Sequence, residues 1–407
     1  MTTQTTDRRT LLILSFALVV VTLGYGIVIP VFPFVIEVLG GSGRDMGMLV
    51  ALAALMELLF GPVWGSISDR VGRKRILMVG IAGYGLSLLG MGLARRMWVL
   101  IASRALSGVL TAATMPTAMA YVGESTSTEE RGAGIGLLGA ASGLGIILGP
   151  GVGGWLGGTS LSLPFFVGAA LAFVSLLLVS LLLPRSQYGE AGAAFASSST
   201  APAASARENW IVRAWRSLSG SAGFPLLLLF IASLGLANFE AVFGLYAART
   251  FGYGPERVGT ILLVIGVVTT LGKGLLTGPA TRRWGDGAVV KGSMIAGGAG
   301  YLILLAAYDY LTVLLATGFF ILSKTVLRPA LLSLISKRSG HGPGGGLGTL
   351  MGAGNTVVSL GRVIGPIWAG FAFDLDPRYP YLSGAAVLAI GFIISLFGLS
   401  GEAGRAV

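Results

Sequence analysis

The chain has 407 residues, of which 54% are hydrophobic and only 11% are charged, and its formal net charge is +11. Soluble domains carry about a quarter charged residues, so this composition, with a mean hydropathy of +0.83, excludes an ordinary soluble protein and indicates a polytopic membrane protein. The cations are scattered through loops between apolar runs, which argues against nucleic acid and for membrane lipids as a partner, and the lack of cysteine excludes disulfides and thiolate metal sites.

Apolar runs of about 20 residues, the length that crosses the hydrocarbon core of a bilayer, predict twelve transmembrane helices and an all-α membrane fold. The predicted spans lie near residues 11–36, 47–66, 76–95, 98–121, 134–155, 164–184, 223–248, 258–277, 289–308, 311–333, 346–370 and 381–400. No small-residue cleavage site follows the first run, so we interpret it as a span and not as a removable signal peptide.

The distribution of positive charge predicts the orientation of the chain. An even number of spans puts both termini on one side of the membrane. The loops and tails on that side hold 17 Lys and Arg residues, and the opposite loops hold 6. Because positive loops stay on the cytoplasmic side, both termini are expected to be cytoplasmic, in a multi-pass protein of the cytoplasmic (inner) cell membrane.

The turn after the second span, residues 65–77, places one acid and four cations between two apolar runs. It resembles the signature loop of the major facilitator superfamily of secondary transporters, through Gly65, Asp69, Arg70, Gly72, Arg73 and Lys74. Small residues let helix ends approach, an acid is favoured at a helix N-terminus, and cations are attracted to the anionic cytoplasmic leaflet. We therefore expect Asp69 at a helix N-terminus and the cations at the membrane surface.

This resemblance implies a cytoplasmic gate. Glu124 follows the fourth span and can pair with Arg73 or Arg131, so that Asp69, Arg73 and Glu124 would form a latch that holds the cytoplasmic side shut. The alternative interpretation is a set of solvated loop charges, because surface ion pairs are individually weak.

The chain also repeats itself. Residues 278–286 are a degraded copy of the turn at 65–73, and Pro116 and Pro329 are related by the same displacement along the chain. The Gly-Pro pairs at 149–150 and 365–366 repeat at a slightly larger displacement, which allows for a small insertion. These landmarks predict two homologous six-helix bundles, residues 1–185 and 223–407, joined by a cytoplasmic linker at 186–222. Residues 209–216 are either an interfacial helix or part of a disordered linker.

Two further segments sharpen the resemblance. Arg104 and its neighbours in the fourth span resemble a superfamily motif in which a buried arginine is tied to proton coupling. The fifth span resembles the antiporter motif of exporters, through Gly145, Gly149, Pro150, Gly153 and Gly154. Glycines four residues apart also make a groove for a neighbouring helix, so pure packing is the alternative. Together the motifs resemble the twelve-span drug:proton antiporter family.

Ionisable residues inside spans are costly, so each is a functional candidate. Glu57, near the middle of the second span, is the first candidate to carry the coupling proton, with Glu240 as the second, and the resemblance ties Arg104 to the same coupling. In the structural alternative, Glu57 is only a permanent partner of a buried cation such as Arg104.

Cations outnumber acids inside the spans. Lys324 and Arg328 are four residues apart and so are expected on one helix face, and Arg362 lies beside the second Gly-Pro pair. This balance favours anionic, zwitterionic or lipid-headgroup substrates over lipophilic cations. The aromatic residues Tyr25, Phe34, Phe239 and Tyr246 are candidates to line the substrate cavity, with packing as the alternative for each.

No catalytic constellation and no phosphate-cradling loop is present, so we expect neither an enzyme nor a cofactor, and an ion gradient as the energy source. The resulting hypothesis is a monomeric, proton-coupled exporter of small amphiphilic compounds. A lipid or glycolipid flippase of the same fold is the alternative within transport, and a non-transporting receptor or scaffold is the alternative outside it.

Overall fold

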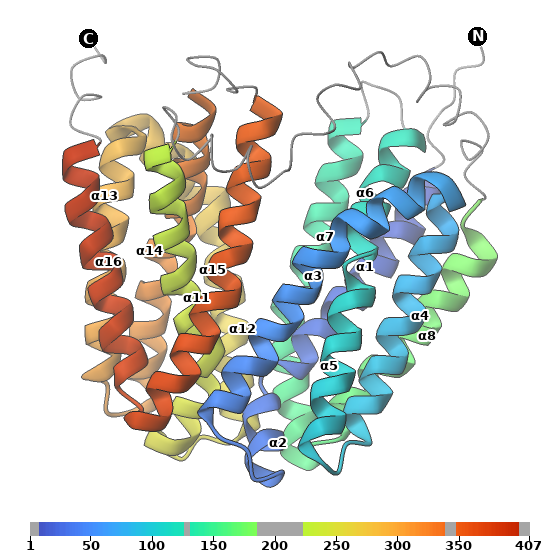
Figure 1. Cartoon of the computed structure of the whole chain (residues 1–407), viewed down its shortest axis with the longest axis horizontal. Coiled ribbons are helices and arrows are strands. Elements are labelled where there is room, and N and C mark those ends of the chain that lie inside the picture. Colours follow the sequence, from blue (N-terminus) through green and yellow to red (C-terminus); the bar gives the residue numbers. More distant parts are fainter. Residues whose placement is uncertain (1–7, 126–130, 185–222, 338–346, 399–407) are drawn as a thin grey trace. The chain divides into compact units, whose positions relative to one another are not determined.

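The computed structural model describes residues 8–125, 131–184, 223–337 and 347–398 (Figure 1). Every regular element in these ranges is a helix, which confirms the all-α fold class. In the first half the helices are α1 (Arg8–Val28), α2 (Phe32–Val38), α3 (Gly43–Val71), α4 (Arg73–Gly92), α5 (Met97–Thr111), α6 (Thr114–Ser125), α7 (Arg131–Thr159) and α8 (Leu163–Leu182). In the second half they are α11 (Gly223–Phe251), α12 (Pro255–Leu271), η2 (Gly272–Leu276), α13 (Thr277–Leu305), α14 (Tyr310–Lys337), α15 (Leu347–Leu375) and α16 (Tyr379–Gly398).

Eleven helical stretches among the described residues are long and apolar enough to cross a membrane. One of them, Pro255–Leu305, has 51 residues, more than twice the length that one crossing needs. It includes Gly285, whose φ of 75° and ψ of 156° break the helix. Division at this glycine gives twelve spans, in agreement with the sequence.

Two predicted spans are each built from two helices. The first ends at Val28 and is followed by the short α2, and the fourth is divided between α5 and α6. Proline explains both breaks: Pro30 and Pro33 flank the start of α2, and Pro116 lies in the first turn of α6. Because proline has no amide hydrogen, a helix does not continue through these positions without loss of a hydrogen bond.

The described helices form two compact units. The first unit comprises Met1–Gly41, Leu52–Ala201 and Tyr253–Leu263. In it α1 packs against α7 and α8, and α4 packs against α5, α6 and α8. The predicted linker at 186–222, with the interfacial helix considered at 209–216, lies outside the described residues.

The second unit comprises Ser42–Ala51, Pro202–Gly252 and Val264–Val407. Here α11 packs against α14, α15 and α16, and α13 packs against α14 and α16 (Figure 1). Leu228, Val290 and Leu331, from α11, α13 and α14, are fully buried in its core. Two helices belong to both units, because α3 begins in the second unit and α12 begins in the first.

Large apolar side chains also cover the outside of the helices. Leu181 of α8 is 72% exposed and Phe397 of α16 is 81% exposed. Extensive apolar exposure of this kind is unfavourable in water and marks a surface that meets another apolar phase. With the long apolar helices, it identifies a multi-pass membrane protein whose outer surface faces lipid.

Candidate functional site

The turn between α3 and α4 is built around a glycine. Gly72 has a φ of 101° and a ψ of 139°, a conformation that other residues rarely adopt. It directly precedes Arg73, the first residue of α4, whose guanidinium pairs with the carboxylate of Asp69 and donates to the hydroxyl of Ser68. The turn is therefore held by a local ion pair across the break between the two helices.

The expectation that Asp69 lies at a helix N-terminus is wrong. Asp69 lies in the last turn of α3, where the helix dipole disfavours an anion, and Arg73 supplies the compensating positive charge. Arg70, also in this last turn, is exposed. A Cβ added to Gly65 would meet no described atom within 4 Å, so close packing does not explain this glycine.

Lys74 has a role that the sequence did not reveal. Its ammonium donates to the backbone carbonyls of Ser180 at 2.8 Å and Leu183 at 2.5 Å, at the C-terminal end of α8. The last carbonyls of a helix have no partner within the helix, and a lysine is well suited to satisfy them. Lys74 therefore ties α4 to α8.

The other predicted members of the gate, Glu124 and Arg131, have side chains outside the described residues. The degraded copy of the turn in the second unit is described, however. Gly285 corresponds to Gly72 and also has a positive φ. Asp286, which is 6% exposed, accepts hydrogen bonds at 2.7 Å from both Ser333 and Lys337.

This second turn relates directly to the predicted latch. The displacement that relates the two turns places Asp286 at the position of Arg73, and Lys337 at the position of Glu124. The second unit thus pairs the counterparts of Arg73 and Glu124 with both charges reversed. The reversal preserves the attraction, because an ion pair depends on opposite signs and not on which helix carries each sign.

Arg104 of α5 lies among aromatic rings in the first unit. The residue is 7% exposed. Its guanidinium carbon is 4.9 Å from the ring centre of Phe32 in α2 and 5.7 Å from that of Tyr25 in α1. Its Nε has no hydrogen-bond partner among the described residues. Glu57, in α3, is half-buried in the same unit. Cation–π contacts thus provide part of the stabilisation of this buried cation.

In the second unit three of the predicted charged residues interact. Glu240 of α11 attracts Arg362 of α15, and Arg362 repels Arg328 of α14. All three side chains are exposed, although they lie in the middle of apolar helices. The structure thus groups one acid and two cations from three helices, a set that can bind a charged substrate group or exchange a proton.

Lys324 is separated from this group. Although only one turn from the exposed Arg328, it is 7% exposed, and its ammonium has no hydrogen-bond partner among the described residues. It lies next to Gly235 of α11 and Gly297 of α13, and its nitrogen is 5.8 Å from the ring centre of Phe320. Lys324 and Arg328, four residues apart on α14, therefore have different surroundings, because neighbouring helices cover only Lys324.

The predicted cavity aromatics have different surroundings. Phe239 and Tyr246 are 1% and 3% exposed, and belong to a packed aromatic cluster in the second unit with Phe243, Phe320, Tyr301 and Tyr381. Phe34 in α2 and Tyr25 in α1 are half-buried. Phe239 and Tyr246 therefore contribute mainly to packing in this structure, whereas Phe34 and Tyr25 keep an accessible part.

The glycine-rich stretch of α7 packs against two different helices. Three of its glycines, Gly145, Gly149 and Gly153, face α1 so closely that an added Cβ would meet the backbone of α1. A Cβ added to Gly145 would lie 2.6 Å from the amide nitrogen of Leu23, and one added to Gly149 would lie 2.6 Å from the Cα of Gly26. Gly154 faces the start of α12, where an added Cβ would lie 2.7 Å from the Cα of Gly259. Pro150 lies between the two helices, since a Cβ added to Gly26 of α1 would lie 2.9 Å from its Cδ and one added to Gly259 of α12 would meet its carbonyl oxygen. The motif thus joins two helices to α7.

A family model, Major Facilitator Superfamily, matches residues 14–366. The chain belongs to this superfamily. Multidrug resistance protein 2 of Bacillus subtilis (strain 168) is 31% identical over 391 residues, which cover 96% of this chain and 95% of that protein. Quinolone resistance protein NorA of Staphylococcus aureus (strain COL) is 26% identical, over 95% of this chain and 96% of its own. The resemblance to drug:proton antiporters is thereby confirmed.

Solved structures show the same fold for the transporter. A bacterial homologue of the human lysosomal transporter Spinster has a TM-score of 0.77 at 13% identity, with 97% of both chains covered. The nucleoside transporter NupG has a TM-score of 0.77 at 12% identity, with 97% of this chain and 99% of its own covered. At such identities these structures support the fold and not the substrate.

Two polar residues of the transporter were missed by the sequence analysis. Asn238, two positions before Glu240, is 1% exposed, and neither polar atom of its amide has a partner among the described residues. A polar amide inside an apolar span is itself a signal that could have been used. Asp374, near the end of α15, forms a contact that no local pattern indicates, and it is described below.

Proposed function

We propose that the protein is a proton-coupled exporter of small amphiphilic compounds, and that its two six-helix halves, residues 1–185 and 223–407, expose one central site to alternate sides of the membrane. The interacting group of Glu240, Arg362 and Arg328 carries this proposal, since ionisable residues in spans are costly and a protein without transport has no need of them. The names of the relatives, multidrug and quinolone resistance proteins, support drugs as the substrate class.

Proton coupling is assigned to Glu57 and Glu240. Arg104 is assigned the role of a fixed positive charge in the same unit as Glu57. A carboxyl group inside a span can take up a proton while it faces the external side and release it while it faces the cytoplasm, so that a proton enters for substrate exported. A membrane potential supplies about 2.3 kcal/mol per charge for each 100 mV, which is enough to drive accumulation.

The substrate preference follows from the charges. Arg328 and Arg362 are both exposed in the spans, against one exposed acid, Glu240. Such a site attracts anionic or zwitterionic amphiphiles and repels lipophilic cations. A lipid headgroup has the same chemistry, so a lipid flippase is the second candidate function.

Gating on the cytoplasmic side is assigned to Asp69 and Arg73 with Glu124 and Arg131. The pair of Asp286 and Lys337, which occupies the corresponding positions of the second unit, supports this assignment. The positive charge of the loops supports cytoplasmic termini in the inner membrane, and a monomer is the proposed working unit.

Reconstitution into proteoliposomes tests the proposal. A pH gradient is imposed, and the movement of a cationic dye, an anionic drug and a labelled lipid is followed in parallel. We expect movement of the anionic drug that stops when an ionophore collapses the gradient. Movement of the lipid alone would replace the exporter by a flippase, and movement of none would contradict transport of all three classes.

A substitution then locates the proton site. Glu240→Gln should abolish accumulation of the drug against its gradient while downhill exchange continues, because exchange needs no net proton movement. Glu57→Gln makes the same test for the first unit. Glu256→Gln, an exposed acid in the first turn of α12, is the matched control. Unchanged accumulation in Glu240→Gln would remove this residue from the coupling mechanism.

A further inference from the structure

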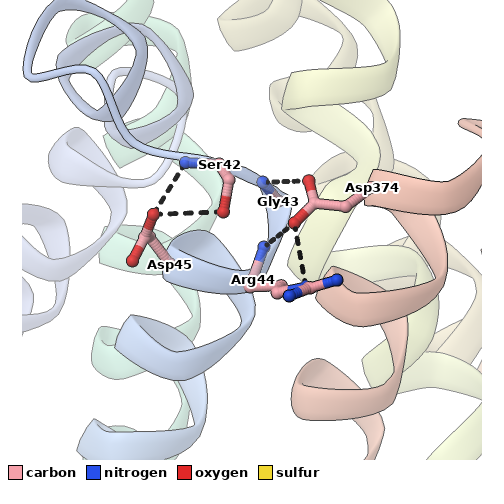
Figure 2. A network of polar contacts seen from close by, with 5 residues as sticks. All are labelled: Ser42, Gly43, Arg44, Asp45 and Asp374. Carbon is pink, nitrogen blue, oxygen red and sulfur yellow. Dashed lines mark hydrogen bonds and ion pairs between the residues drawn. The ribbon is translucent and has the colours of Figure 1, made fainter.

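The start of α3 is held by a carboxylate from a distant part of the chain. The amide of Gly43 donates to one oxygen of Asp374 at 2.7 Å, and the amide of Arg44 donates to the other at 3.0 Å (Figure 2). Gly43 and Arg44 are the first two residues of α3, so their amides have no acceptor within the helix. Both sides of this contact belong to the second unit.

The contact with α3 stabilises the negative charge of Asp374, which its own helix does not. Asp374 lies in the last turn of α15, where the dipole of its own helix disfavours a negative charge. The N-terminus of α3 offers the opposite end of a dipole and two free amides. The Nε of Arg44 lies 3.5 Å from the carboxylate, and the guanidinium carbon lies 4.9 Å from the ring centre of Phe371. The side chain of Asp374 is only 17% exposed.

Small residues bring the two helices into contact here. An added Cβ at Gly43 would lie 2.8 Å from a carboxylate oxygen of Asp374, and one at Gly47 would lie 3.1 Å from the Cα of Gly370. The neighbouring acid, Asp45, cannot replace Asp374, because its carboxylate already accepts hydrogen bonds from Ser42. The amide of Ser42 donates at 2.7 Å and its hydroxyl at 3.1 Å (Figure 2). The approach of α3 to α15 is thus specific to Asp374.

We propose that Asp374 is a releasable lock: its two hydrogen bonds hold the start of α3 to the end of α15, and transport breaks them at every turnover. Since α3 begins in the second unit and continues in the first from Leu52, motion between the units must bend α3 or detach its start. The lock lies at the membrane side opposite the termini, which the positive-inside rule makes the external side. The proposal rests on the alternating access proposed above.

Because the native chain has no cysteine, a single introduced cysteine reports the state of the lock. Ala51→Cys is a suitable reporter, since Ala51 is 3% exposed and follows Gly43 and Gly47 at intervals of four residues, on the same face of α3. The rate of modification by a membrane-impermeant maleimide, added outside vesicles, measures how often this face opens. Tyr308→Cys, at a position that is 80% exposed in the loop before α14, serves as the reporter that is always accessible.

The lock is weakened by Asp374→Asn, which keeps the size of the side chain but removes the charge and one acceptor oxygen. We expect the Ala51→Cys reporter to be modified at least about fivefold faster, as the loss of one charged hydrogen bond predicts. The matched control is Asp376→Asn, two residues further along the chain. Among the described contacts, the carboxylate of Asp376 accepts a hydrogen bond from the amide of Arg378 at 2.8 Å, within its own turn. The control should leave the modification rate unchanged.

Equal rates in Asp374→Asn and Asp376→Asn would overturn the lock. If Asp374→Asn does not fold, Gly43→Ala makes the same test, because its methyl group displaces the carboxylate. The modification assay needs no substrate and no proton gradient. It therefore separates the two proposals. If Asp374→Asn is modified faster but the parent protein transports nothing, the lock is retained and the exporter is refuted. If the parent protein transports but Asp374→Asn is modified at an unchanged rate, the exporter is retained and the lock is refuted.

Discussion

Two pairs of helices in this transporter meet through the same kind of surface but are held differently. In the second unit α3 meets α15, and in the first unit α12 meets α7. Each contact combines glycine and proline at intervals of four along each helix: Gly43, Gly47, Pro366 and Gly370 in the former, and Pro150, Gly154, Pro255 and Gly259 in the latter. Such spacing lets two helix backbones approach closely within a bilayer.

The two contacts differ at the residue one helical turn beyond the last small residue, Asp374 on α15 and Gly158 on α7. The displacement that relates the two Gly-Pro pairs places Asp374 of α15 at the position of Gly158 in α7. Asp374 bonds to the start of α3, whereas Gly158 faces the side chain of Glu256 in the first turn of α12. Among the described residues no hydrogen bond joins α7 to α12. The two units therefore share the packing surface, and only the contact in the second unit has a polar clamp.

The largest expected effect comes from filling the close contact that has no clamp. In Gly154→Ala the new methyl group would lie 2.5 Å from the carbonyl oxygen of Pro255 and 2.7 Å from the Cα of Gly259. Backbone atoms cannot rotate away, so we expect the free energy of unfolding to fall by about 1–3 kcal/mol. Thermal unfolding in detergent measures this as a lower Tm.

Gly139→Ala is the control on the same helix. Its methyl group meets no described atom within 4 Å, and alanine is preferred to glycine within a helix, so stability should be unchanged or slightly higher. If Gly154→Ala is as stable as Gly139→Ala, the small residues are not what holds α7 to α12.

A clamp can also be transplanted, with a smaller expected effect. Gly158→Asp combined with Glu256→Gly places a carboxylate on α7 opposite the first turn of α12 and removes the side chain with which it would collide. New hydrogen bonds to free amides at the start of α12 should raise the free energy of unfolding by about 0.5–1.5 kcal/mol relative to Glu256→Gly alone. A tighter contact should also slow transport in proteoliposomes. No gain in Tm over the single variant would show that the position of an acid is not enough to make a clamp.

Sequence reasoning found the Gly-Pro pairs of this repeated surface, but not their partner helices, because the pairs depend on local spacing alone. Runs of apolar residues defined the spans, and the Gly-Pro pairs at 149–150 and 365–366 marked corresponding helices. The breaks inside the first and fourth predicted spans were not anticipated, although Pro33 and Pro116 mark them. A hydropathy pattern is insensitive to a single lost hydrogen bond, so it merged each pair of helices into one span.

The polar contacts could not be predicted in the same way. Lys74 bonds to carbonyls more than 100 residues away, and Asp374 bonds to an amide 331 residues away. Nothing in the local pattern names such partners, since they depend on which helices become neighbours. Lys324 and Arg328 show the same limit: the helical period places them on one face, but the covering helices bury only Lys324.

The smallest expected effect compares the long-range clamp with a local one. Asp309, in the loop before α14, accepts hydrogen bonds from the hydroxyl of Thr312 at 2.5 Å and from its amide at 2.7 Å. These bonds, the one from the hydroxyl first, lower the pKa of the Asp309 carboxyl below its ordinary value of about 4. Asp309 thus caps its own helix, whereas Asp374 caps another.

The sign of the pH effect follows from this lowered pKa. Since the folded state favours the ionised carboxylate, its contribution to stability is fully present above the ordinary pKa and is lost as the pH falls through the lower, folded-state value. The difference in Tm between the parent protein and Asp309→Asn should therefore be small at pH 7 and vanish in strong acid, without a change in the modification of the Ala51→Cys reporter. A faster modification in Asp309→Asn would mean that any acid at this end of the molecule controls the start of α3, and the distinction between a local cap and a lock would be lost.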